Sequence, residues 1–489
     1  MPTIIVDGEA YEGGPGGDTV LVRANNVTAE GNRGDDWLST QLYRQTVEGV
    51  SLSTDLFGEA GDDILMTSMG LEGSPDDYEI PLSISATLDG GAGDDDIWAD
   101  FNSAFASQYV TADAGDGDDR VTISQAFIDE ANSGNEMHRS EAMVLAGNGD
   151  DVISVLLREG GYIGVTGGDI GTLSTIHGSA GADDITSDVA SWSGADAENS
   201  LYGGHGADTI RAIASARADW GGGYAYNRVR GGEGDDRIEM EADADERAAT
   251  NSVTGDAGND TISVLGVTLW GSAYSDISGG AGDDRLTARI ETSNENVEDY
   301  PVTAFNSIEG DAGDDRIIGV ISLGDTFDET GEFYSALYGG AGDDHITARG
   351  GFDNLLAGGR GDDTLRGSGN SDRLIGGQGA DVLRGGGGED EFVFRSARGE
   401  TSERDRVADF TQGEDLINLS GIDADASRSG NQTFRFGDLT GTTRAWVEED
   451  PDSNGSLFHA DNGRDVLVIS IRDGGGMDAS DYEAGDFLL

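Results

Sequence analysis

The chain has 489 residues, a formal net charge of −66, 79 glycines and no cysteine, and its 29 basic residues are all arginine. This composition argues against long helical bundles, disulfide frameworks and thiolate metal sites. So acidic a surface excludes nucleic-acid phosphate as a partner and favours cations. No apolar run approaches 18 residues, so no membrane span is predicted.

The N-terminal segment, MPTIIVDGEAYEGG, has no basic stretch followed by an apolar core. An ordinary secretory signal peptide is therefore not predicted. Taken alone, this start would favour a cytoplasmic protein, but the repeats that follow it argue for a different location.

From residue 13 onward the chain repeats the pattern Gly-Gly-x-Gly-x-Asp-x-U-x, in which U is a large aliphatic residue. Glycine permits the left-handed backbone of a tight turn. The aliphatic residue at position eight should begin a short strand with its side chain pointing inward. The sixth position is Asp in all seventeen copies, at Asp18, Asp36, Asp63, Asp95, Asp119, Asp151, Asp183, Asp208, Asp236, Asp260, Asp284, Asp315, Asp344, Asp363, Asp372, Asp381 and Asp390.

An unbroken run of Asp at one position indicates that a carboxylate is required there. A purely structural Gly-Asp turn would tolerate Asn or Ser. Calcium takes about six to eight oxygen ligands, carboxylates and carbonyls among them, so two stacked turns could complete a shell that one turn cannot. The variable fifth position, as at Asp283, is expected to face solvent. The predicted metal ligands are the sixth-position aspartates from Asp63 to Asp390 and the first glycine of each clear copy, Gly90, Gly203, Gly231, Gly279, Gly339, Gly358 and Gly376.

This nonapeptide resembles the calcium-binding repeat of RTX (haemolysin-type) proteins. The resemblance implies a parallel β-roll with several Ca²⁺ ions, each lying between the turns of successive coils. The expected fold class is all-β: a parallel β-roll or β-solenoid with Gly-Asp-rich calcium turns, long loops on one edge and a β-rich C-terminal cap.

The spacing of the aspartates divides the repeat region. From Asp363 onward they fall nine residues apart, as in a β-roll with turns on both edges, whereas upstream most fall 24 to 32 apart. Residues 1–350 are therefore predicted to form a long-coil solenoid with ions on one edge, and residues 351–395 a compact nonapeptide β-roll. The loops of the opposite edge are expected to hold Trp98, Trp192, Trp220, Tyr224, Tyr226, Trp270 and Tyr300.

Residues 396–489 are predicted to be a C-terminal cap and secretion signal. The run DFTQGEDLINLSGIDA, which begins at Asp409, and the tail from Asp486 to Leu489 resemble the cap of serralysin-type proteins. In that family this end directs one-step export, so the resemblance implies a secreted, extracellular protein and a type I exporter as partner. The alternative is a plain hydrophobic terminus that packs on the cap.

One segment in this region matches the spacing of an EF-hand loop, through Asp450, Asp452, Asn454, Gly455 and Asp461. An EF-hand needs flanking helices, yet TTRAWVEE and SLFHAD alternate as strands do. A hairpin with a PDSNG turn is therefore the preferred prediction.

No catalytic constellation is found in the sequence. The five histidines, at positions 138, 177, 205, 345 and 459, form no HExxH motif, and there is no GxSxG or GxxxxGK[ST] motif. The chain is predicted not to be an enzyme: it should fold on Ca²⁺ binding after export and act as an extracellular, surface or adhesion component. The alternative is a carbohydrate-active solenoid related to polysaccharide epimerases or lyases, with extracellular polysaccharide as its partner. Ice binding is disfavoured because the loops are irregular.

Overall fold

The computed structural model describes residues 4–6, 10–45, 51–72, 82–103, 106–127, 139–158, 170–192, 195–217, 222–292, 302–324, 331–395, 404–424, 432–437, 444–451, 455–462, 466–472 and 478–489. The chain forms two compact units, one built on residues up to Ala273 and one built on residues from Tyr274 onward.

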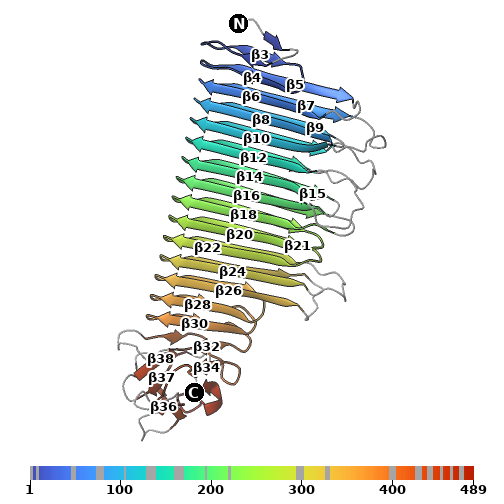
Figure 1. Cartoon of the computed structure of the whole chain (residues 1–489). Helices are drawn as coiled ribbons and strands as arrows, with labels where there is room; N and C mark the ends of the chain where they lie inside the picture. The colour runs from blue at the N-terminus through green and yellow to red at the C-terminus, as the bar shows by residue number, and fades with distance from the viewer. Residues whose placement is uncertain are drawn as a thin grey trace. The chain divides into compact units, whose positions relative to one another are not determined.

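The first unit consists of parallel strands that alternate between two sheets (Figure 1). Odd-numbered strands pair only with odd-numbered neighbours, from β1 to β21, and even-numbered strands only with even-numbered neighbours, from β2 to β20. The strands are β1 (Ile4–Val6), β2 (Tyr11–Glu12), β3 (Thr19–Val22), β4 (Val27–Glu30), β5 (Trp37–Gln45), β6 (Leu52–Ala60), β7 (Ile64–Glu72), β8 (Leu82–Ala92), β9 (Asp96–Ser103), β10 (Ala106–Asp116), β11 (Arg120–Phe127), β12 (Ser140–Asn148), β13 (Val152–Arg158), β14 (Ile170–Ala180), β15 (Asp184–Trp192), β16 (Asp196–His205), β17 (Thr209–Arg217), β18 (Ala225–Glu233), β19 (Arg237–Ala244), β20 (Ala249–Ala257) and β21 (Thr261–Thr268).

The second unit continues the alternation and then adds a cap. Strands β23 to β33 and β24 to β34 again pair odd with odd and even with even. Its elements are β22 (Ala273–Ala281), β23 (Arg285–Thr292), β24 (Thr303–Ala312), β25 (Arg316–Leu323), β26 (Glu332–Ala341), β27 (His345–Gly350), β28 (Asn354–Arg360), β29 (Thr364–Arg366), β30 (Asp372–Gln378), β31 (Val382–Arg384), β32 (Glu391–Val393), β33 (Arg406–Val407), β34 (Leu416–Asn418), β35 (Arg435–Phe436), β36 (Arg444–Glu449), β37 (Ser456–Asp461), β38 (Val466–Ile471), the 3₁₀ turn η2 (Ala484–Asp486) and β39 (Phe487–Leu488).

The core follows from alternation within each strand. In β16 every second residue is buried, so Ala197, Asn199 and Leu201 point inward while the residues between them point outward. The register between coils then places aliphatic side chains of successive coils next to one another. Ile176, Leu201 and Val229 occupy one such inner column. The core is therefore a thin layer between two sheets, and each coil is buried by its neighbours.

The fold class predicted from the repeats is confirmed, including the calcium-type turns, but the aromatic residues are not all in loops. Trp98 lies in β9 and Tyr226 in β18, and Trp192 is the last residue of β15. The prediction was wrong for these three because β9, β15 and β18 run for eight or nine residues and include these positions. Trp220 and Tyr300 lie outside the described residues.

The cap contains the predicted hairpin and closes both sheets. Strands β36 and β37 are antiparallel, with Arg444 opposite Asp461, and β38 joins them to β33. The C-terminal β39 pairs with β34, and Phe487 stacks on Phe458 at 4.6 Å between ring centroids. The antiparallel pairing of the preferred hairpin prediction is confirmed, while residues 452–454 of the predicted PDSNG turn lie outside the described residues. In the described part of the chain, no helix has the length and apolar character that crossing a membrane would require.

Candidate metal centre

The turn between each even strand and the following odd strand requires glycine at fixed places. Between β8 and β9, Gly91 and Gly93 have φ of +100° and +132°. A Cβ at Gly93 would also lie 2.1 Å from the carbonyl oxygen of Gly61 in the preceding coil. Both the left-handed backbone and the close approach therefore exclude a side chain at the fourth position.

The sixth-position aspartates form a ladder that runs from coil to coil. Each accepts through Oδ1 the backbone N–H of its counterpart in the preceding coil, as where the N–H of Asp63 donates to Asp95 at 2.7 Å. In the first unit the ladder joins Asp18, Asp36, Asp63, Asp95, Asp119, Asp151, Asp183, Asp208, Asp236 and Asp260. In the second unit it joins Asp284, Asp315, Asp344, Asp363, Asp381 and Asp405.

A second ladder begins on the opposite edge of the compact coils. The N–H of Asn354 donates to Asp372, that of Asp372 to Asp390, and that of Asp390 to Asp415. Asp372 and Asp390 thus lie on a different edge from Asp363 and Asp381. The nine-residue spacing from Asp363 onward corresponds to this alternation between edges.

The other carboxylate oxygen of these aspartates is buried. Every predicted ligand aspartate is no more than 3% exposed. Among the residues that the structure describes, Oδ2 has no hydrogen-bond partner in Asp36, Asp63, Asp95, Asp119, Asp151, Asp183, Asp208, Asp236, Asp315, Asp344, Asp363 and Asp381. Because a buried polar atom without a partner is costly, a repeated row of them indicates that another group satisfies these oxygens.

The glycine at position one leaves the space into which Oδ2 points. A Cβ on Gly90 would lie 2.4 Å from Oδ2 of Asp95 and 2.5 Å from the carbonyl oxygen of Ala114 in the next coil. The same carboxylate oxygen lies within 2.1–2.4 Å of the Cβ position in all seven predicted glycines, Gly90, Gly203, Gly231, Gly279, Gly339, Gly358 and Gly376. The oxygens that meet here are one carboxylate per turn and backbone carbonyls, the donor set of a hard cation.

Side chains alone do not make the site. Among the described residues, no three or more His, Cys, Asp or Glu side chains cluster closely enough to hold an ion together. The residues present nevertheless fit calcium, because that ion takes backbone carbonyls as well as carboxylates as ligands. The candidate centre is therefore built by the stacking of turns.

The electrostatics of the ladder also favour a cation. Burial raises the pKa of Asp95 to about 7 against the opposing effect of the bond from the Asp63 N–H, and the charges of Asp119 and Asp63 add to the rise. The pKa of Asp363 rises to about 8, again chiefly by burial and with the Asp381 charge contributing. Stacked buried carboxylates repel one another, so positive charge between them would favour their ionised form.

The fifth position does more than the sequence predicts. Asp283 is exposed, as expected, but its Oδ1 accepts the N–H of Asp314 from the next coil at 2.9 Å. Likewise the Asp118 N–H donates to Asp94 at 3.0 Å. The expectation that these side chains only face solvent is therefore incomplete: they form a second, exposed ladder whose bonds run in the opposite chain direction.

Three ladder residues were missed because their turns do not keep the full glycine pattern of the repeat. Asn354, Asp405 and Asp415 each receive a backbone N–H or extend a ladder as repeat aspartates do. Burial raises the pKa of Asp405 to about 7 and that of Asp415 to about 6. The signal present in sequence is the shorter pattern of Asp or Asn followed two residues later by an aliphatic residue, as in Asp405-Arg406-Val407.

Comparison with protein families agrees with this geometry. A family model described as peptidase M10 serralysin C terminal matches residues 144–444. The chain belongs to this family. The model of the RTX calcium-binding nonapeptide repeat (4 copies) matches residues 12–41 and 87–103. No curated protein matches the chain.

The two family models indicate which metal the protein binds and by which class of secretion system it is exported. RTX nonapeptide repeats bind calcium, so the cofactor of this serralysin C-terminal family member is Ca²⁺ in several copies. Together the repeats and the C-terminal domain identify a calcium-binding protein of the type I secreted class, which is extracellular.

Proposed function

We propose that this chain is a non-enzymatic extracellular protein whose coils are assembled by Ca²⁺ bound between successive turns. The proposed ligands are the aspartates and glycines predicted from the repeat, together with Asp405 and Asp415. The observation that carries this assignment is the row of buried Oδ2 atoms, which in the copies that begin with glycine point into the space beside that glycine. Each ion would join two coils, so binding and folding would be coupled.

We also propose three functional segments: residues 1–350 as a long-coil solenoid, 351–395 as a compact β-roll, and 396–489 as a cap with the export signal. The start of the opposite-edge ladder at Asn354 supports the first boundary. The short strands β28 to β31, of three to seven residues, support the compact assignment.

The absence of an HExxH motif from the sequence supports a role other than zinc peptidase. We propose a surface or adhesion component, exported by a type I exporter and in contact with extracellular polysaccharide or a cell surface. A repeated scaffold with an acidic edge that binds Ca²⁺ suits such a role, because the ions can rigidify it outside the cell.

Calorimetric titration of Ca²⁺ into the chelated protein, followed in parallel by far-UV circular dichroism, tests the calcium assignment. We expect many ions per chain to bind as β-signal appears, with Mg²⁺ much less effective because it demands tight octahedral geometry. A chelated protein that keeps its full β-spectrum and protease resistance would refute it. Incubation of the calcium-loaded protein with casein and with uronate polymers should yield no cleavage products; appearance of products would refute the non-enzymatic role.

A further inference from the structure

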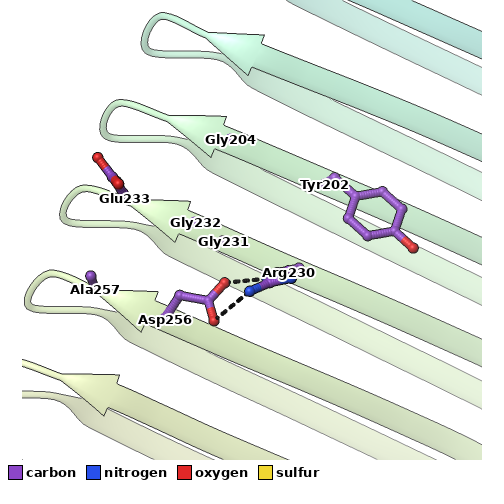
Figure 2. A pocket seen from close by; sticks show the side chains of 8 residues that line it. All are labelled: Tyr202, Gly204, Arg230, Gly231, Gly232, Glu233, Asp256 and Ala257. Atoms are coloured by element: carbon purple, nitrogen blue, oxygen red, sulfur yellow. Dashed lines mark hydrogen bonds and ion pairs between the residues drawn. The ribbon is translucent and has the colours of Figure 1, made fainter.

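A hollow of about 450 Å³ opens on the outer face of the even-numbered sheet in the first unit. Its walls come from β16, β18 and β20 close to their turns, and Figure 2 shows the side chains of Tyr202, Arg230 and Asp256 on three successive strands. Turn glycines form part of its floor. One of them, Gly231, also borders the buried Oδ2 of Asp236, so the hollow adjoins this turn.

One wall is an aromatic surface held in place by a second ring. His177, Tyr202 and Arg230 occupy one outward column, because the strand register places each opposite the next. The His177 and Tyr202 rings stack with centroids 4.5 Å apart and an angle of 12° between their planes. Tyr202 remains partly exposed and lines the hollow.

The other wall is formed by the ion pair between Arg230 and Asp256. Arg230 binds Asp256 through two nitrogens, with Nη2 at 3.2 Å from Oδ1 and Nε bonded to Oδ2. Thr254 also donates to Asp256 Oδ1 at 3.3 Å. The planar guanidinium–carboxylate pair is thus oriented before any ligand arrives, and the remaining guanidinium N–H groups and carboxylate lone pairs can still bond a ligand.

We propose that this hollow binds an uncharged saccharide. A pyranose ring presents an apolar C–H face that packs on an aromatic side chain, here Tyr202. Its neighbouring hydroxyls both donate and accept hydrogen bonds, which matches Asp256 as acceptor and Arg230 as donor. A preoriented aromatic surface beside polar groups is typical of small-ligand sites in shallow concavities.

The charges that line the hollow and the net charge of the chain disfavour binding of an acidic saccharide. The Arg230 charge is compensated by Asp256, and Glu233 adds a further carboxylate to the lining. The chain as a whole carries −66. A polyanion would therefore meet net repulsion, whereas a neutral polymer would not.

The aromatic residues at the other end of β18 extend the site. Tyr224 and Tyr226 stack at 5.5 Å, and the Arg247 guanidinium lies 5.0 Å from the centre of the Tyr224 ring. Tyr226 and Arg230 are four residues apart on one strand, or about 13 Å at the rise of a β-strand. The face therefore offers two contact points to one oligosaccharide chain.

Affinity electrophoresis of the calcium-saturated protein through gels containing dextran, laminarin, galactomannan or hyaluronan tests the proposal. We expect at least one of the three neutral polymers to retard the protein and hyaluronan not to. Tyr202→Ala and Arg230→Ala should each weaken binding at least tenfold, whereas Tyr202→Phe should keep most of it. The matched control is Tyr109→Ala, which removes an exposed tyrosine from the outer face of β10 and should bind as the unmodified protein does.

Failure of all three neutral polymers to retard the protein would overturn the proposal, as would stronger binding of hyaluronan. Equal binding by Tyr202→Ala, Arg230→Ala and Tyr109→Ala would place any saccharide site elsewhere. Since Arg230 is exposed, Arg230→Gln provides a further variant that keeps the fold, and circular dichroism at saturating Ca²⁺ verifies each variant. The outcome is independent of the calcium ligand assignment, which the titration above tests.

Discussion

The two carboxylate oxygens of a ladder aspartate have different partners. Oδ1 of Asp95 accepts the N–H of Asp63, whereas Oδ2 points into the space beside Gly90. An Asn in place of Asp95 keeps an amide oxygen for the N–H but loses the negative charge. The substitution therefore separates the backbone role of the side chain from its proposed role toward a cation.

We expect Asp95→Asn to remove one or two bound Ca²⁺ ions per chain, because the oxygens of two coils meet at each space beside a position-one glycine. Asp94→Asn is the matched control, since Asp94 is exposed and accepts one N–H from Asp118. Its calcium stoichiometry should be unchanged. Equilibrium dialysis measures both; equal losses would contradict the assignment of the sixth position as the ligand.

Replacement of the glycine at the fourth position of the repeat should destabilise the fold most. Gly93→Ala places a Cβ in a left-handed backbone, which alone costs about 1–2 kcal/mol, and the new atom would lie 2.1 Å from the Gly61 carbonyl oxygen. We expect the free energy of unfolding in urea at saturating Ca²⁺ to fall by more than that amount. Gly16→Ala, where a Cβ would meet nothing within 4 Å, should change it by less than about 0.5 kcal/mol. Similar losses in both would show that backbone strain is not the cause.

At the scale of elements, a buried row of asparagines links three even-numbered strands across the core. Asn199 donates to Asn227 at 2.8 Å and Asn227 to Asn251 at 2.9 Å. Each amide also donates to a carbonyl of the facing sheet, as Asn227 does to Glu241 at 2.7 Å. The row therefore sets the register between the two sheets, because a one-residue shift would leave these buried groups unsatisfied.

We expect Asn227→Ala to lower the free energy of unfolding by at least about 2 kcal/mol, since it leaves polar groups of both neighbours and a facing carbonyl without partners. Asn148→Ala is the control: that side chain is exposed and donates to Asp116 on a turn, so its loss should cost below about 0.5 kcal/mol. Urea unfolding at saturating Ca²⁺ compares them. A loss at Asn227 no larger than at Asn148 would show that the row does not stabilise the fold.

For the whole molecule, the ladder makes stability depend on pH. Burial raises the folded-state pKa of Asp63 to about 6, of Asp151 to about 7 and of Asp363 to about 8, whereas an unfolded Asp titrates near ~3.9. Between these values the folded state binds more protons than the unfolded state. Stability of the calcium-free chain is therefore greatest below about pH 4 and falls as pH rises toward 8.

Circular dichroism of the chelated protein across this range should show more β-structure at pH 4.5 than at pH 8. Protons and Ca²⁺ compete for the same carboxylates of the folded chain, so the calcium concentration that half-saturates the folded chain should rise as pH falls from 8 to 5. If the β-signal of the chelated chain does not change with pH, ionisation of the buried carboxylates does not oppose folding.

We propose that the C-terminal tail both packs in the folded cap and serves as the export signal of the whole chain. In the folded cap Phe487 is buried, pairs with Ile417 and stacks on Phe436 and Phe458. An exporter that reads this side chain can therefore reach it only before the cap folds. Low cytoplasmic calcium would keep the chain loose until export, because extracellular modules load at about 10⁻⁴–10⁻³ M.

Residues 391–489 fused to a small passenger should direct its export through a matching type I exporter. A passenger carrying residues 144–243 instead, which are repeats without the tail, should stay inside. Removal of the last dozen residues from the full chain should also abolish export, measured as the fraction of protein in the medium. Export of the truncated chain at the original level would exclude the tail as the signal.

The sequence alone determines what the nine-residue pattern encodes locally. Glycines at positions with positive φ, an inward aliphatic residue and an invariant Asp specify a turn and the start of a strand, and the change of spacing at Asp363 predicts turns on both edges. These features are readable because each depends on backbone conformation within a few neighbouring residues.

Only the tertiary structure determines which residues of neighbouring coils lie opposite one another. The bond from Asp118 to Asp94, the row of Asn199, Asn227 and Asn251, and the pairing of Tyr202 with Arg230 all join residues at least 24 positions apart. Loops of unequal length separate these partners, so no fixed spacing reveals them. Stacking of the coils sets the register between strands, and that register determines both which oxygens converge beneath the turns and which side chains meet on the outer face.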